Sequence, residues 1–180
     1  MHSKLLNKLY SYGITGKLYK WIASFVQNRF QCVAIENCFS SVANVISGVP
    51  QGSVLGPILF ILFINDIDSV CHGQTNIKLF ADDAKLYSEI DLNERFVSFQ
   101  TSLYNLATWA DAWQLSINVQ KCCVLSTVRN KRTSHSGSMN YYLNGILLTN
   151  NEHVLDLGIT ISADLSYIAH INNIVAKALQ

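Results

Sequence analysis

The chain has 180 residues, of which 49% are hydrophobic and 14% are charged. A chain of this length can bury a substantial core as one domain, and its apolar content excludes wholesale disorder. The 13 basic and 12 acidic residues leave a formal net charge of +1, which gives no electrostatic sign of a strong nucleic-acid binder.

The cysteine pattern and the longest apolar run argue against two further kinds of protein. The five cysteines include no C-x-x-C pair, and none has metal-ligand spacing to a histidine, so we expect free thiols rather than a zinc site. The run from Val54 to Ile64 is well short of the roughly 20 residues that span a bilayer. Because the N-terminus also has no apolar signal core, we expect an intracellular chain without a membrane partner.

Two helices are expected at the start of the chain. Ser3 can cap the first helix, which Gly13 would end, and Thr15 can cap the second. Apolar residues at helical spacing are Leu5, Leu6 and Leu9 in the first and Leu18, Trp21, Ile22 and Phe25 in the second.

The apolar period then changes to that of strands. Residues 29–36 and 40–48 predict a hairpin around Glu36, Asn37 and Cys38. The loop VPQGS follows, after which Ser53 can cap a buried apolar helix that tolerates a proline only in its first turn.

Residues 76–88 predict a second hairpin with Asp82 and Asp83 at its tip. Asp91 and Glu94 then resemble a capping box at the start of a long helix. Its apolar residues alternate at spacings of four and three and favour a helix packed on a sheet: Leu92, Phe96, Phe99, Leu103, Leu106, Ala110 and Trp113.

The remaining segments complete an α+β pattern. KCCVLSTV predicts a strand, RNKRTSHSGSMN a polar loop, and YYLNGILL with HVLDLGITIS a closing strand pair before a short helix after Ser166. Helices and antiparallel hairpins thus alternate without a regular strand–helix–strand order, which is typical of the α+β class.

Asp82 and Asp83 stand side by side where a hairpin ordinarily carries Asn-Gly or Asp-Gly. A solvent-exposed turn tolerates such a pair, because the repulsion in water is only about 1 kcal/mol. Apolar neighbours such as Leu79 and Leu86 favour partial desolvation, where the repulsion rises toward about 4 kcal/mol unless a divalent cation neutralises it. The hairpin alone is therefore compatible with a plain turn and with a metal site.

The loop SGVPQGS, residues 47–53, favours the metal site. Gly48 and Gly52 let the backbone approach a ligand closely, Pro50 stiffens the loop, and the helix N-terminus that follows can face an anion. Carboxylates that hold a metal, together with a loop that shapes the wall beside them, fit phosphate chemistry.

The stretch SGVPQGSVLGPILFILFINDI followed by LFADDAKLY resembles motifs B and C of reverse transcriptases, specifically those of LINE-type (non-LTR) retrotransposons of the jockey/CR1 sort. The resemblance covers residues 1–180 as a single partial domain, with motif B at 47–53 and motif C at 80–83. Looser resemblances put motif D at about 109–122 and motif E at about 154–162. The resemblance as a whole implies part of a polymerase palm, an α+β fold in which helices pack on an antiparallel sheet. Most of the fingers and the thumb would be absent.

The resemblance implies an RNA-directed DNA polymerase that works by two-metal nucleotidyl transfer. Asp82 and Asp83 would be catalytic and would bind two Mg²⁺ ions, and Lys121 would be either a proton donor to pyrophosphate or an ordinary lysine at a strand start. Contacts to the template and the incoming nucleotide would come from Gly48, Pro50, Gln51, Gly52 and Phe80, the last also supporting the hairpin. The expected partners are an RNA template, a DNA primer and deoxynucleoside triphosphates, in a nuclear or cytoplasmic ribonucleoprotein.

The family's motif A, D-F-x-x-A-F-D, does not occur in the sequence, and the opening MHSKLLNKL resembles the residues that directly follow that motif. We therefore expect a fragment that begins just after motif A and does not polymerise alone. Asp66 and Asp68 are expected at a helix end rather than as substitutes for the motif A carboxylate. The alternative is a non-catalytic retrotransposon remnant that acts at most as an RNA- or protein-binding module.

Overall fold

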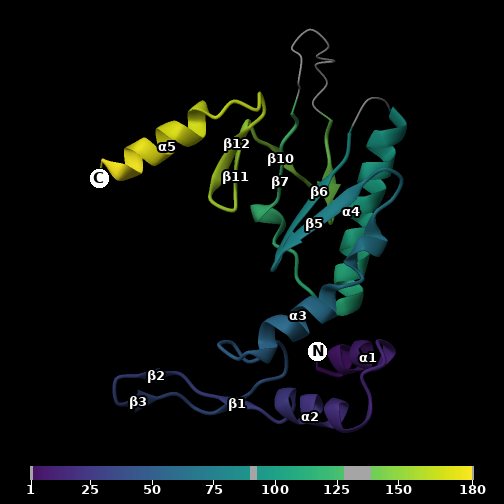
Figure 1. Cartoon of the computed structure of the whole chain (residues 1–180), viewed down its shortest axis with the longest axis vertical. Helices are drawn as coiled ribbons and strands as arrows, with labels where there is room; N and C mark the ends of the chain where they lie inside the picture. The colour runs from purple at the N-terminus through teal and green to yellow at the C-terminus, as the bar shows by residue number, and fades with distance from the viewer. Residues whose placement is uncertain (1, 90–92, 128–138, 180) are drawn as a thin grey trace.

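The structure is a computed structural model that describes residues 2–89, 93–127 and 139–179. Helices and strands mix along the chain, as the sequence predicted (Figure 1). The helices are α1 (His2–Ser11), α2 (Gly16–Val26), α3 (Leu55–Ile64), α4 (Asn93–Trp113) and α5 (Ile168–Ala178), with the short 3₁₀ helices η1 (Ile67–Val70) and η2 (Val119–Lys121). The strands are β1 (Phe30–Gln31), β2 (Ala34–Ile35), β3 (Cys38–Phe39), β4 (Ala43–Asn44), β5 (Asn76–Phe80), β6 (Asp83–Tyr87), β7 (Cys123–Val124), β8 (Tyr142–Leu143), β9 (Ile146–Leu147), β10 (Thr149–Asn150), β11 (His153–Asp156) and β12 (Ile159–Ser162).

The described strands form six separate two-stranded ladders and not one continuous sheet. Five ladders are antiparallel, whereas β7 pairs with β10 in parallel. Antiparallel pairing between neighbouring strands is therefore present as predicted, but the described strands do not join into the single antiparallel sheet that was predicted. Most of the strands are two residues long, and such short strands offer little free edge to a third strand.

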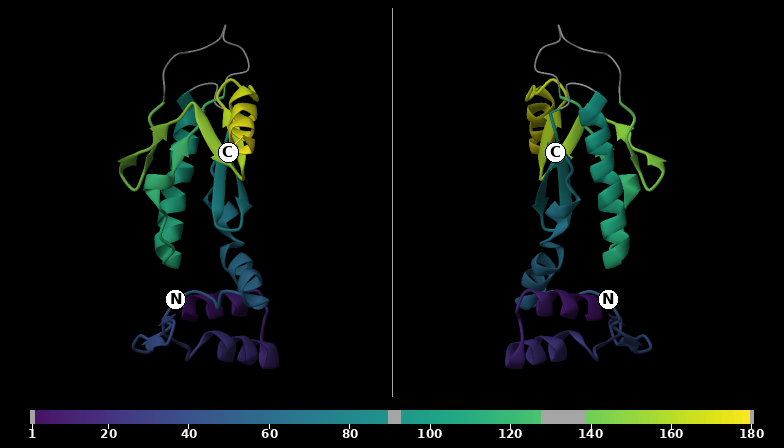
Figure 2. Two further views of the ribbon diagram at one scale, coloured as in Figure 1. Left: turned by 90° about the vertical axis from the view of Figure 1, so that its left-hand side faces the viewer. Right: turned by 90° about the vertical axis from the view of Figure 1, so that its right-hand side faces the viewer.

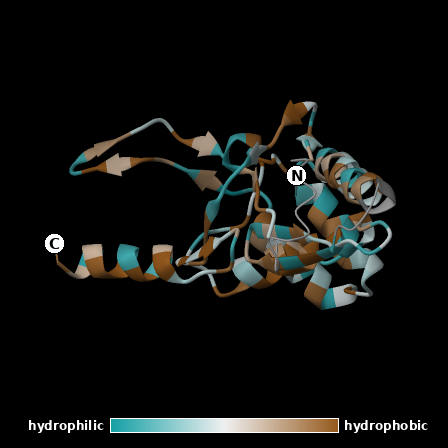
Figure 3. Ribbon diagram, turned by 90° about the horizontal axis from the view of Figure 1, so that it is seen from above, coloured by the Kyte–Doolittle hydropathy of each residue, from teal (hydrophilic) through white to brown (hydrophobic). Residues whose placement is uncertain are grey.

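The first hairpin lies where the sequence predicted it. β2 and β3 pair directly across the turn Glu36–Asn37, and β1 pairs with β4 further from the turn. Apolar side chains of this hairpin, such as Ile35 and Phe39, are exposed. Figure 3 shows that the hairpin and α5 both project from the body of the molecule.

Helices α1, α2 and α3 share one hydrophobic core. Its most deeply buried side chains are Leu9, Val26 and Leu59. α1 already includes His2, so Ser3 lies inside the helix and the prediction that Ser3 caps it was wrong. Gly13 follows the end of α1 as predicted, with a φ of +85° that favours glycine.

Helix α2 begins after Thr15, which occupies the predicted N-cap position without a side-chain capping bond. Its buried residues are Ile22 and Val26, whereas Leu18 and Trp21 are exposed. Only part of the predicted apolar stripe therefore faces the core.

The N-cap residue of α3 is Val54, one residue after the predicted Ser53, but the Ser53 side chain still bonds the first turn. Its Oγ accepts a hydrogen bond from the Gly56 N–H at 3.0 Å and donates one to the Pro50 carbonyl at 2.6 Å. Leu59 and Phe63 on α3 are buried, but Ile58 and Ile61 are exposed. The predicted buried helix is therefore buried on one face only, the face that shares a core with α1 and α2.

Helix α4 packs on the strands and on η1, as its apolar spacing predicted. Leu103 and Ala107 contact the core around Tyr141, and Leu106 contacts η1. The rings of Phe96 and Phe99 have centroids 5.1 and 5.0 Å from that of Tyr141. The predicted capping box of Asp91 and Glu94, the side chain of Leu92, and most of the polar loop of residues 129–140 lie outside the described residues.

The C-terminal segments form two hairpins, β8–β9 and β11–β12, and the predicted pairing of one segment with the other was wrong. The turn of the first hairpin is Asn144–Gly145, in which both residues have positive φ, the conformation that Asn-Gly favours in a two-residue turn. The predicted terminal helix is α5, and the Ser166 Oγ accepts a hydrogen bond from the Ile168 N–H near its start. None of the helices in the described ranges is long and apolar enough to cross a membrane.

A buried lysine joins α1 to α3 and α4. The Lys8 side chain is only 4% exposed, and its Nζ lies 2.6 Å from both the Phe63 carbonyl oxygen and the Asp66 Oδ1. The same Nζ lies 3.7 Å from the centroid of the Trp113 ring, and the Trp109 Nε1 donates to the Asp66 Oδ1 at 3.2 Å. Because a buried ammonium is costly unless it is paired, these contacts fix α1 in one position.

We expect Lys8→Met to destabilise the fold by about 2 kcal/mol, since it keeps the apolar stem but leaves Asp66 and the Phe63 carbonyl without their cation. Urea unfolding followed by circular dichroism measures this loss. The matched change at the exposed Lys17 should alter the free energy of unfolding by less than about 0.5 kcal/mol. Equal stability of the two variants would contradict a structural role for Lys8.

Candidate active site

The hairpin β5–β6 carries the two adjacent aspartates. Phe80 pairs with Asp83, so the two-residue turn is Ala81–Asp82, and Asp83 is the first residue of β6. The prediction that both aspartates form the tip was therefore off by one residue. Ala81 takes the positive φ of 51°, a strained conformation for a residue with a Cβ.

The two faces of this hairpin differ in what they contact. Ile77 and Leu86, which pair across the strands, pack against the core that includes Leu106 of α4. By strand alternation, Asp83 and Phe80 belong to the other face, and Phe80 is 63% exposed. The core thus holds the hairpin by one face and leaves the Asp83 face to solvent.

Both aspartate side chains are exposed, and neither has a hydrogen-bond or ion-pair partner among the described residues. Oxygen ligands of this kind suit a hard divalent cation. Within the described part of the chain, no group of three or more His, Cys, Asp or Glu residues is placed to hold a metal ion. Asp82 and Asp83 therefore fit as part of a ligand set.

An ion pair that sequence reasoning missed joins this hairpin to β11. The Lys85 Nζ contacts the Asp156 Oδ2. Lys85 lies two residues after Asp83 and so on the same face of β6. The two-residue spacing of Lys85 from Asp83 could be seen in the sequence. The pairing with Asp156 could not, because Asp156 lies 71 positions further along the chain. The ion pair with Asp156 engages Lys85, while Lys78, which pairs with Lys85 across the strands, is a second cation on this face.

The loop of residues 47–53 leads into α3, toward which the tip of the β5–β6 hairpin is directed (Figures 1 and 2). Gly48 and Gly52 have φ of +79° and +75°, and a Cβ at either would meet nothing within 4 Å. Both glycines are therefore needed for their backbone conformation, and the space beside them is open. The His2 Nε2 lies 2.9 Å from the Gly48 carbonyl oxygen, an anchor that the sequence did not indicate.

Gly56 is the crowded glycine of this region. A Cβ there would lie 3.0 Å from both the Pro50 carbonyl oxygen and the Ser53 Oγ. Pro50 is half-buried and Gln51 is exposed. Gly48 and Gly52 were the glycines predicted to matter in this loop, but the glycine most closely packed against it is Gly56.

Lys121 lies at the exposed end of η2. No hydrogen bond or ion pair in the described residues links it to Asp82 or Asp83. Burial and the neighbouring Cys123 raise the pKa of the adjacent Cys122 thiol above its ordinary value. The structure thus brings the two aspartates together and leaves Lys121 without a contact to them.

Comparison with known proteins identifies the family. Residues 1–161 match the model of "Reverse transcriptase (RNA-dependent DNA polymerase)". The chain therefore belongs to the reverse transcriptase family.

Curated relatives from fruit flies agree with this membership. The chain is 33% identical over 165 residues to the "RNA-directed DNA polymerase from mobile element jockey" of Drosophila melanogaster, a match that covers 88% of the chain and 18% of the relative. It is 31% identical over 180 residues to the protein of the same name from Drosophila funebris, covering 96% and 19%. It is 30% identical over 169 residues to the "Probable RNA-directed DNA polymerase from transposon BS" of Drosophila melanogaster, covering 90% and 18%. The chain thus spans about a fifth of the length of these relatives, and the expected likeness to non-LTR retrotransposon enzymes is confirmed.

We expect Asp156→Asn to weaken Mn²⁺ binding at the hairpin, because it frees Lys85 to pair with Asp83. Exposed ion pairs contribute about 0.2–1 kcal/mol, which corresponds to a change of up to roughly fivefold in Kd. Electron paramagnetic resonance titration of free Mn²⁺ measures the affinity. The double variant Lys85→Met with Asp156→Asn should recover the original Kd, and a Kd that is the same in all three proteins would contradict this electrostatic role.

Proposed function

We propose that this chain is the part of an RNA-directed DNA polymerase that carries motifs B to E, and that Asp82 and Asp83 are its metal-binding catalytic residues. The observation that supports this most strongly is the exposed Asp82–Asp83 pair, without a partner among the described residues, on a hairpin whose other face is fixed by the core. Family membership supports the reaction class. Because the chain spans only a fifth of its relatives, the activity belongs to a longer protein in this proposal.

Asp82 and Asp83 would bind divalent metal, Mg²⁺ in our proposal. Metal held by these carboxylates would supply activation of the primer 3′-hydroxyl and neutralisation of charge on the triphosphate. The protein's contribution is to hold the two carboxylates at a fixed position, since the Ile77 and Leu86 face is packed on α4. Phe80, exposed on the Asp83 face, offers a ring against which a base or sugar can pack.

The loop of residues 47–53 would form the wall beside the incoming nucleotide and the template. Gly48 and Gly52 leave open space next to their backbone, which allows a strand to approach closely. Pro50 and Gln51 belong to the same wall, and Ser53 with Gly56 fixes the loop to the start of α3.

Motifs D and E would complete the site from the other side. We assign Lys121 as a proton donor to the leaving pyrophosphate, a role compatible with its exposed position. β11 and β12 correspond to motif E, and the Lys85–Asp156 ion pair links them to the aspartate hairpin. The proposed partners are an RNA template, a DNA primer and deoxynucleoside triphosphates, within a nuclear or cytoplasmic ribonucleoprotein.

A chimera tests this proposal. The preceding residues of the Drosophila melanogaster jockey relative, which would supply the motif A carboxylate, are joined to this chain, and DNA primer extension on an RNA template is measured in Mg²⁺. We expect extension by the chimera and none by the 180-residue chain alone. Asp82→Asn in the chimera should lower the rate by roughly a thousandfold or more, because it removes a metal ligand from the transition state.

Asp164→Asn is the matched control, an exposed aspartate beyond the residues that match the family model. It should leave the rate unchanged. Full activity of the Asp82→Asn chimera would contradict the catalytic assignment. Extension by the chain alone, abolished by Asp82→Asn, would keep that assignment and contradict the need for a further carboxylate.

A further inference from the structure

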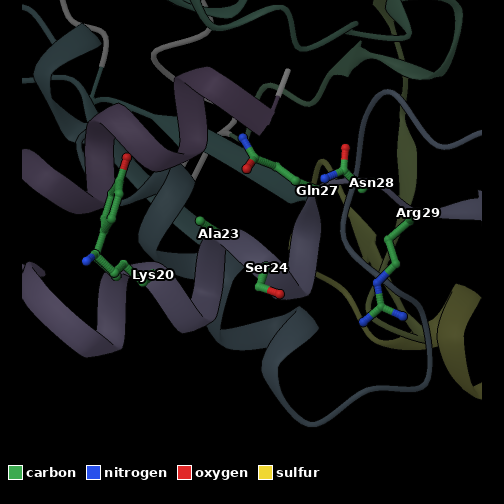
Figure 4. A pocket seen from close by; sticks show the side chains of 7 residues that line it. Lys20, Ala23, Ser24, Gln27, Asn28 and Arg29 are labelled. Carbon is green, nitrogen blue, oxygen red and sulfur yellow. The ribbon is translucent and has the colours of Figure 1, made fainter.

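A polar hollow lies on α2, in a different part of the molecule from the aspartate hairpin (Figures 1 and 4). It has a volume of about 590 Å³ and its polar lining consists mainly of Lys20, Ser24, Gln27, Asn28 and Arg29. Figure 4 shows Lys20 and Arg29 at opposite ends of the hollow, with Ser24 between them. No acidic residue lines it.

The charge of the surrounding segment has one sign. The segment before Glu36 contains Lys4, Lys8, Lys17, Lys20 and Arg29 and no acidic residue. Since the whole chain has a formal charge of only +1, the residues from Glu36 onward are net acidic. Lys8 is buried and paired, so Lys17 and Lys20 on α2, with Arg29 just beyond its end, give this surface its positive charge. A concentrated patch of this kind attracts a polyanion even though the net charge of the chain does not.

Arg29 is held in place at the edge of the hollow. Its Nε donates to the Phe25 carbonyl at 2.9 Å, and its guanidinium carbon lies 5.3 Å from the centroid of the Phe25 ring. No described residue pairs with the terminal guanidinium nitrogens, which leaves them available to two oxygens of one phosphate. Because the Arg29 guanidinium is already held in place, less entropy is lost when it binds a phosphate.

An aromatic platform continues from Arg29 along α2. Trp21 is 56% exposed and stacks on Phe25, with ring centroids 6.5 Å apart and an interplanar angle of 27°. Trp21 and Phe25 are four residues apart and therefore lie on one side of α2, and Arg29, beyond the end of the helix, joins them through its contacts with Phe25. Neither Trp21 nor Phe25 lines the hollow, and the platform meets it at Arg29, which contacts Phe25. A basic hollow that leads to an exposed aromatic ring suits single-stranded nucleic acid, in which phosphates pair with cations and bases stack.

We propose that the α2 hollow is a binding site for the phosphate backbone of a single-stranded RNA segment, with Trp21 as the stacking surface for a base. Lys20 and Arg29 contact phosphates at the two ends of the hollow, and Ser24, Gln27 and Asn28 donate neutral hydrogen bonds between them. The choice of RNA among polyanions rests on the function proposed above. The site itself is separate from the aspartates, and it would hold a strand outside the polymerising centre.

Fluorescence anisotropy of a labelled 12-nucleotide RNA with the 180-residue chain tests the proposal over a series of salt concentrations. We expect Lys20→Glu with Arg29→Glu to weaken binding at low salt by tenfold or more, and to lower the slope of log K against log salt by about 1.4, the value for two single-strand phosphate contacts. Trp21→Ala should weaken binding by roughly fivefold or more. Because all three side chains are exposed, the thermal unfolding midpoint should not change.

Matched variants separate a specific site from general charge. Lys20→Glu should weaken binding several-fold more than Lys177→Glu, which makes the same charge change at an exposed lysine of α5. Equal effects of these two variants, or none from the double variant, would overturn the site. Displacement of the RNA by millimolar inorganic phosphate at constant ionic strength would overturn the assignment to a strand and leave only an anion site. Asp82→Asn should not alter RNA binding, so failure here and failure of the polymerase proposal give different results.

Discussion

The position of Lys8 is the constraint on which the arrangement of the helices depends. An ammonium group that is almost fully buried must find its acceptors inside the protein, and Lys8 finds them at the end of α3 and at Asp66. The same Nζ lies 5.3 Å from the ring centroid of Trp109 and 3.7 Å from that of Trp113, both on α4. One side chain of α1 therefore fixes the relative positions of the two helices that carry the candidate active site. The loop of residues 47–53 precedes α3, and the aspartate hairpin packs on α4.

The contacts of Lys8 also assign a structural role to Asp66, which follows the end of α3. Asp66 accepts hydrogen bonds from Lys8 and from the Trp109 indole, so it has a structural partner on each side. Asp82 and Asp83 have none among the described residues, which they share with the exposed Asp68 and Asp111, so it is their adjacent position on the fixed hairpin that distinguishes them. Paired carboxylates stabilise the fold, whereas unpaired ones on a fixed scaffold keep their oxygens for a metal and its substrate.

The sequence predicted what depends on local periodicity and turn chemistry. The predicted helices appear near their expected positions, and so do the two hairpins that end at Glu36–Asn37 and at the aspartates. It could not predict which apolar side chains of a helix find a partner: Trp21, one of the apolar residues at helical spacing in α2, is exposed. The Asn144–Gly145 pair is typical of a two-residue hairpin turn. It could have predicted the β8–β9 hairpin in place of a pairing between the two C-terminal segments. In the site, the aspartates and the glycine loop followed from motifs, whereas the Lys85–Asp156 contact depends on folding that no local pattern specifies.

We propose above all that Asp82 and Asp83 form a metal-binding pair on a hairpin whose other face is fixed by the core. Nuclear magnetic resonance of the ¹⁵N-labelled chain, titrated with substoichiometric Mn²⁺, tests it most directly, because the paramagnetic ion broadens the amide signals nearest to its ligands. The account predicts that the signals of Ala81, Asp82 and Asp83 broaden first, while that of Asp164, an exposed aspartate outside the hairpin, stays sharp. Equal broadening at Asp164, or an unaffected hairpin, would contradict the account.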